Sequence, residues 1–141
     1  MSQQVEKRLI TEWLWQFHRE HQQWKRIRLG QVPTRDMAQL YKVGLFWADA
    51  IVFDPPHLLI VEAKIRPSLA AIGQLEAYRE LLKVTPEFEQ FRGNPIRLVL
   101  LTTIEDRNVR RFCEDKGIEY IIFKPEWAEA YWKERLLRYL D

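Results

Sequence analysis

The sequence predicts an α/β protein with one mixed sheet that has helices on both faces. Apolar residues follow a helical period at the start, then fall into three strand-like runs, and then alternate between helix and strand, giving the order αβββαβαβα. Three meandering strands followed by helical crossovers imply a mixed sheet. A chain of 141 residues, 47% hydrophobic and 30% charged, fits a single domain over residues 1–141.

The first half of the chain predicts one helix and three strands. Residues 2–23 place their apolar side chains at helical spacing on one stripe. Residues 24–29 alternate as a strand, with Trp24 opposite Ile27, and residues 30–45 form a polar loop. The apolar runs 46–53 and 58–65, separated by an Asp-Pro-Pro-His turn, predict an antiparallel hairpin.

The second half predicts three helices that alternate with two strands. Pro67 and Ser68 mark a helix start, Pro86 limits that helix, and Gly117 closes the next one. The expected ranges are a helix over 69–83, a strand over 96–102, a helix over 105–116, a strand over 118–123 and a helix over 125–140.

Charge, cysteine content and the N-terminal residues limit the class of protein. The net charge of +2 is too small for a polycation, so any nucleic-acid binding requires basic residues gathered on one face. The single Cys113 cannot form an internal disulfide. The first residues lack an apolar signal region, and no window approaches the roughly 18 apolar residues of a membrane span. We therefore expect a cytoplasmic protein with no membrane partner.

Charged residues interrupt the two apolar runs of the predicted hairpin. Side chains alternate in a strand, so Glu62 and Lys64 point to the same face. The neighbouring strand carries Asp49, and the hairpin brings it beside Glu62. Two carboxylates placed close together in an apolar setting need a divalent cation or a proton to neutralise them.

Two further polar residues lie on or beside the buried faces of helices. Glu6 lies near the middle of the apolar stripe of the first helix, where an acid is anomalous. Gln74 shares the side of Tyr78 and Leu81 at the edge of the buried stripe of its helix. We expect both side chains to point toward the sheet.

Several of these residues also have a purely structural interpretation. Glu62 and Lys64 can be an ion pair on an exposed sheet surface, and Gln74 can be an ordinary polar residue at a helix edge. The three histidines, at positions 18, 21 and 57, show no metal-ligand spacing and are interpreted as surface residues.

An Asp on one strand, a turn, Glu-x-Lys on the next strand and then a helix with Gln resemble the PD-(D/E)XK nuclease superfamily. That superfamily contains restriction enzymes, Holliday-junction resolvases and repair nucleases. The similar segments are 48–53, 59–64 and 71–75, the last with the sequence Ala-Ile-Gly-Gln-Leu, followed by Tyr78. The resemblance implies a restriction-endonuclease-like αβββαβ core over about residues 2–102, with the later elements as additions. Ala48 replaces the Pro of the motif.

The resemblance also implies roles for individual residues. Asp49 corresponds to the first acid of the motif, Glu62 to the second and Lys64 to its lysine, while Glu6 resembles the helix-one Glu and Gln74 the helix Gln. Asp49, Glu62 and the Ala63 backbone carbonyl offer hard oxygen ligands suited to Mg²⁺ or Mn²⁺. Lys64 would hold the attacking water and neutralise charge on the phosphate. The expected activity is metal-dependent hydrolysis of DNA phosphodiester bonds, as an endonuclease.

Basic residues near this motif are candidates for phosphate contacts. They are Lys25, Arg26, Arg28, Arg35, Lys42 and Arg66. So short a chain would cover few base pairs alone, so a homodimer is expected if both strands are cut, with exposed Trp127, Tyr131 and Trp132 as candidate interface residues. The alternatives are a catalytically silent DNA-binding or assembly module and a nuclease gated within a larger DNA-processing complex.

Overall fold

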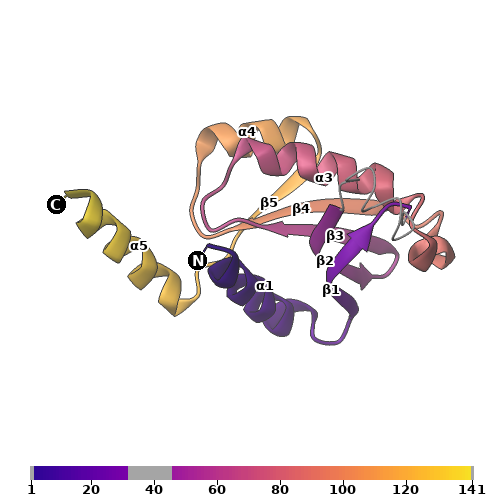
Figure 1. Ribbon diagram of the computed structural model, residues 1–141, viewed down its shortest axis with the longest axis horizontal. Coiled ribbons are helices and arrows are strands. Elements are labelled where there is room, and N and C mark those ends of the chain that lie inside the picture. Colours follow the sequence, from indigo (N-terminus) through magenta and orange to yellow (C-terminus); the bar gives the residue numbers. More distant parts are fainter. Residues whose placement is uncertain (1, 32–45, 141) are drawn as a thin grey trace, which may run out of the picture.

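The computed structural model describes residues 2–31 and 46–140, which form one five-stranded sheet with helices on both faces (Figure 1). The strands are β1 (Gln22–Leu29), β2 (Phe46–Asp54), β3 (His57–Ala63), β4 (Ile96–Thr102) and β5 (Ile118–Ile122). The helices are α1 (Ser2–His18), α3 (Leu69–Leu82), α4 (Arg107–Asp115) and α5 (Glu126–Leu140), with a 3₁₀ helix over Pro86–Phe91.

The strands lie in the sheet in the order in which they occur in the chain. β1, β2 and β3 form an antiparallel meander, and the β2–β3 hairpin closes at the pair of Asp54 and His57. β4 pairs parallel to β3, and β5 parallel to β4, because α3 and α4 carry the chain back to the end of the sheet at which the preceding strand begins. The predicted mixed α/β fold is therefore confirmed.

Each face of the sheet has its own apolar core. Figure 1 shows α3 and α4 over one face and α1 over the other. On the α3 side Ile60 packs with Leu75, whereas on the α1 side Val61 packs with Leu9 and Trp13. Among the described residues no helix is long and apolar enough to span a membrane.

The first helix ends earlier than its apolar period indicates. It stops at His18, whose carbonyl accepts a hydrogen bond from the His21 N–H at 2.9 Å, and β1 begins directly after this turn. Phe17, predicted on the buried stripe, is 53% exposed as a result of its place in the final turn. The 3₁₀ helix was not predicted from the sequence, and its Phe88 and Phe91 pack against Trp24.

The prediction that side chains alternate strictly along β1 is wrong, because the backbone of Arg26 has a positive φ of 48°. A residue in this left-handed conformation interrupts the pleat, and the strand then continues with its faces exchanged. Trp24 therefore packs against the same core as Ile27 and Leu29, although the sequence pattern placed Trp24 opposite them.

The prediction that the aromatic residues at the start of α5 are exposed is wrong, because they are half-buried against their own chain. Trp127 donates a hydrogen bond to Glu12 on α1, and Trp132 donates to the Thr103 hydroxyl at 2.8 Å. Both indoles and Tyr131 pack at the edge of the core under α1. The exposed apolar residues of α5 lie further along the helix, at Leu136, Leu137 and Tyr139.

Thr85 connects the end of β1 to the end of α3. Its hydroxyl accepts the Gly30 N–H at 2.7 Å and donates to the Leu81 carbonyl at 2.7 Å, and Thr85 is buried. Thr85→Val keeps the shape but leaves the Gly30 N–H without its acceptor, so we expect a loss of about 1–3 kcal/mol in unfolding free energy. Urea denaturation measures this loss, with Thr85→Ser as the control that keeps the hydroxyl. Equal stability of wild type and Thr85→Val would contradict the prediction.

Candidate active site

Asp49 lies where β2 and β3 separate. The last pair of the hairpin is Ala50 with Val61, and continuing that register places Asp49 opposite Glu62. Beyond this pair the Asp49 carboxylate takes the place of a backbone acceptor, because its Oδ2 accepts the Ala63 N–H at 2.7 Å. The carboxylate is thereby held at the end of β3.

Glu62 is a buried residue and the second-to-last residue of β3. It is 4% exposed, and its Oε1 has no hydrogen-bond partner among the described residues. Burial, together with the charge of Asp49 and a hydrogen bond to it, raises the pKa of Glu62 to about 9, although the Lys64 charge opposes this. Glu62 is therefore protonated at neutral pH unless a cation stabilises its charge.

Glu6 reaches the same place from the other face of the sheet. Its Oε2 accepts the N–H of Ile65, just beyond β3, at 3.1 Å. Burial raises the pKa of Glu6, the hydrogen bond and Lys64 lower it, and the Asp49 charge raises it further. The anomalous acid in the apolar stripe therefore lies beside the acids of the hairpin.

Lys64 and Gln74 complete the predicted set. Lys64 is half-buried, and its N–H donates to the Leu101 carbonyl at 2.8 Å, which fixes the backbone at the end of β3. Its charge acts on both Glu6 and Glu62. Gln74 lies on α3, over the sheet face that carries Glu62, and in the described part of the chain its buried Oε1 has no hydrogen-bond partner. We call Glu6, Asp49, Glu62 and Lys64 the acid cluster.

Tyr78 belongs to this neighbourhood, although the sequence assigned it no role. Its hydroxyl donates to the Trp47 carbonyl at 2.9 Å, which ties α3 to the start of β2. Burial and the charges of Glu62 and Asp49 raise the pKa of Tyr78 to about 12, so it remains a neutral donor. Tyr78 follows Gln74 by four residues, one helical turn further along α3, and this spacing is the sequence signal that places both side chains on the same side of the helix.

The acid cluster suits a hard divalent cation. The pKa values of Glu6 and Glu62 are raised, in part by the charge of Asp49, and the buried Glu62 Oε1 lacks a partner among the described residues, so a cation would stabilise this arrangement. Asp49 and Glu62 supply oxygen donors, which Mg²⁺ and Mn²⁺ prefer. Glu6 of the acid cluster and the nearby Gln74 offer further side-chain oxygens around the end of β3.

Two of the predicted basic residues gather beside the acid cluster. The guanidinium carbons of Arg26 and Arg28 lie 5.3 Å and 5.8 Å from the centre of the Trp47 ring. Trp47 is two residues before Asp49 on β2 and is 39% exposed. Lys25 and Arg66 are exposed near the same strands, whereas the predicted contacts Arg35 and Lys42 lie outside the described residues.

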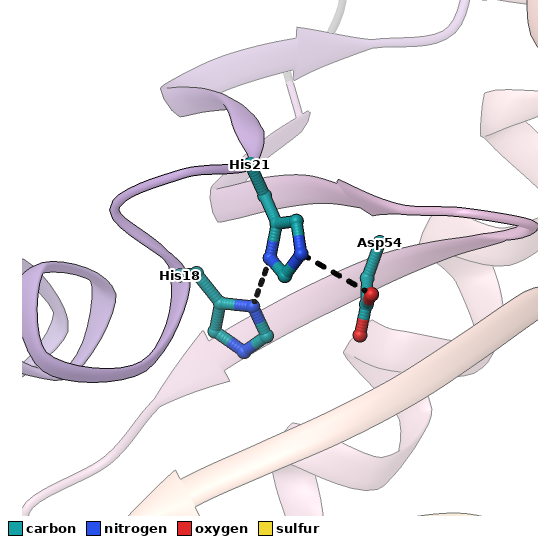
Figure 2. A group of neighbouring side chains, drawn as sticks. All are labelled: His18, His21 and Asp54. Atoms are coloured by element: carbon teal, nitrogen blue, oxygen red, sulfur yellow. Dashed lines mark hydrogen bonds and ion pairs between the residues drawn. The ribbon is translucent and has the colours of Figure 1, made fainter.

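The interpretation of the histidines as separate surface residues is wrong for two of them. His18 and His21 are half-buried and lie together with Asp54 at the other end of the hairpin (Figure 2). Burial lowers the pKa of His18, and the neighbouring His21 and Arg97 lower it further against the effect of Asp54. The spacing of three residues was visible in the sequence, but the third member comes from a strand that only the fold brings near.

Comparison with solved structures identifies the fold. A repair endonuclease from Pyrococcus abyssi matches with a TM-score of 0.55 and 18% identity, over 84% of this chain and 47% of that protein. EndoMS in a complex with double-stranded DNA matches with a TM-score of 0.52 and 18% identity, over 85% of this chain and 45% of EndoMS. The chain thus shares the fold of the matched part of these two proteins and spans just under half of their length. No protein-family model and no curated protein matches the sequence.

Proposed function

We propose that the protein is a metal-dependent DNA endonuclease of the PD-(D/E)XK type. The observation that carries this proposal is the convergence of Glu6, Asp49, Glu62 and Lys64 on the end of β3. The two solved structures support it, since both belong to endonucleases and one of them is bound to double-stranded DNA.

Asp49, Glu62 and the Ala63 carbonyl are the groups that would hold Mg²⁺ or Mn²⁺. The bound cation would polarise the scissile phosphate and lower the pKa of a water molecule. The Ala63 N–H orients the Asp49 carboxylate in advance, so little side-chain freedom is lost when the site is used.

Lys64 supplies the positive charge of the site. Its ammonium would hold the attacking water and neutralise the charge that develops on the phosphate during hydrolysis. Glu6, fixed by the Ile65 N–H, and Gln74 would orient water around this centre.

Arg26, Arg28 and Trp47 form the surface on which the DNA backbone would lie. The two arginines lie on the edge strand β1 with their guanidinium groups over the indole ring of Trp47, and the β1–β2 register brings them near Asp49. Phosphate contacts of this kind hold DNA without reading its sequence. Lys25 and Arg66 would extend the basic surface.

The direct test is cleavage of linear, circular, single-stranded and branched DNA by the purified protein. Each substrate is incubated with Mg²⁺, Mn²⁺ or EDTA, with Asp49→Ala as the control for contaminating nucleases. We expect cleavage by wild type with either metal and none with EDTA or with Asp49→Ala. Cleavage of circular DNA identifies an endonuclease. DNA binding without cleavage of any form would favour a silent or complex-gated module.

Substitution of Arg26, whose backbone is left-handed, is expected to change stability and DNA binding in opposite directions. Arg26→Gly removes the steric cost of a positive φ, so we expect the free energy of unfolding to rise by about 1 kcal/mol. The same change removes one phosphate contact, and we expect weaker DNA binding with a salt dependence reduced by about one charge. Thermal unfolding and DNA binding at several salt concentrations measure the two effects.

Lys25→Gly is the matched control for Arg26→Gly. It removes the same charge from the neighbouring residue, but glycine in an ordinary strand position lowers stability. A fall in stability for both variants would show that the conformation of Arg26 carries no strain.

A further inference from the structure

A second cluster of side chains lies at the end of the hairpin opposite the acid cluster. α1 ends at His18, and β1 begins one residue after His21. Gln22 pairs with Phe53, so the antiparallel register places His21 opposite Asp54, the last residue of β2. Three separate elements thus deliver two imidazoles and one carboxylate to a single point (Figure 2).

The distances in this cluster are close to those of a metal site. The Nδ1 atoms of His18 and His21 are 2.9 Å apart, and His21 Nε2 is 3.4 Å from Asp54 Oδ1. One possible ligand atom from each residue lies within 4.8 Å of the other two. Ligand atoms around a tetrahedral zinc ion are separated by about 3.3 Å, given zinc–nitrogen bonds of about 2.0–2.1 Å. His21 now contacts His18 through Nδ1 and Asp54 through Nε2, and an imidazole binds an ion through one nitrogen, so the His21 ring would rotate when all three residues bind one ion.

The backbone around His18 favours a cation and is itself held in place. His18 ends a helix of 17 residues, where the helix dipole favours positive charge. Its carbonyl accepts hydrogen bonds from the His21 N–H and, at 3.0 Å, from the Gln23 side-chain amide. The turn that carries both histidines is therefore fixed before any metal binds.

Arg97 is the charged group that competes for Asp54. It lies 3.9 Å from Asp54 Oδ2, but its guanidinium makes two hydrogen bonds of 2.6 Å to Glu119. Glu119 therefore compensates most of the Arg97 charge, and Asp54 Oδ1 faces His21.

We propose that His18, His21 and Asp54 bind one zinc-class divalent ion, with its fourth coordination position open to water. Two imidazole nitrogens and one carboxylate select zinc-class ions over Mg²⁺, which prefers oxygen ligands. This site is independent of the acid cluster and of the activity proposed for it. The ion would link the end of α1 to the end of β2, so it stabilises the folded protein.

Calorimetric titration of metal-free protein with Zn²⁺ tests the proposal, in wild type and in an Asp49→Ala background that disables the acid cluster. We expect one zinc ion per chain in the Asp49→Ala background and a rise in melting temperature on binding. Adding His21→Ala or Asp54→Asn should lower the zinc affinity by more than the roughly 10- to 100-fold that outer-shell changes cost. An excess of Mg²⁺ should leave binding at this site unchanged.

His57→Ala is the matched control, because His57 pairs with Asp54 across the hairpin but lies outside the proposed ligand set. We expect it to keep the wild-type zinc affinity. Asp54→Asn preserves size, and circular dichroism verifies the fold of each variant. Absence of zinc binding in the Asp49→Ala background, or equal affinity in folded Asp54→Asn, would overturn the proposal and leave the cluster as a hydrogen-bonded network.

Discussion

Lys64→Ala is expected to lower the rate of DNA cleavage by at least about 100-fold while metal binding changes little. Removing one positioned donor that acts on transition-state charge costs about 10²–10³ in rate. Lys64 offers no oxygen ligand to the metal, so its removal should lower the rate constant of cleavage and leave the metal affinity unchanged. Single-turnover cleavage and calorimetry with Mn²⁺ measure the two quantities separately.

Lys83→Ala is the matched control for this change. Lys83 is an exposed lysine that pairs with Glu80 at 2.7 Å on the outer surface, and its removal should leave cleavage at the wild-type rate. A collapse in the thermal stability of Lys64→Ala would instead indicate that Lys64 serves to neutralise Glu62 as a structural ion pair.

Glu62→Gln is expected to abolish cleavage and to stabilise the metal-free protein at alkaline pH. Folding raises the pKa of Glu62 to about 9, so the folded state keeps a proton that the unfolded chain releases above its ordinary value of 4.5. The stability of wild type must therefore fall as pH rises from 4.5 towards 9. An amide carries no such penalty, and we expect a gain of about 1–3 kcal/mol at pH 8.

Thermal unfolding from pH 5 to pH 9, with and without Mn²⁺, tests this prediction. In EDTA the melting temperature of Glu62→Gln should exceed that of wild type by several degrees at pH 8 and converge with it near pH 5. Mn²⁺ should raise the melting temperature of wild type alone. Glu129→Gln, at an exposed acid 3.3 Å from Lys133, is the control and should show neither effect. A wild type whose stability does not depend on pH would contradict a protonated Glu62.

Local geometry explains why the sequence could predict most of the acid cluster. Asp49 and Glu62 lie on two strands joined by a short turn, and Lys64 directly follows the second strand, so alternation and hairpin register place them without knowledge of the rest of the fold. Glu6 was found because an acid inside an apolar stripe violates the helical pattern. Their assigned roles in metal binding and catalysis stay predictions.

The features that the sequence did not predict depend on contacts between distant segments. The cluster of His18, His21 and Asp54 needs the pairing of β1 with β2, and the early end of α1 depends on the turn that starts this pairing. Arg26 adopts a conformation that no local propensity of arginine favours. Trp127 and Trp132 are covered because their N–H groups find acceptors on α1 and after β4.

Because the strands lie in the sheet in chain order, the order of synthesis is also the order of the strands across the sheet. No strand must be inserted between two that are already paired, and each new strand finds its neighbour present at a free edge as the chain emerges. The β2–β3 hairpin is a local contact, so we expect it to form before α3 packs over it. We therefore expect Glu62 to remain hydrated and ionised in the nascent chain and to take up its proton when α3 docks.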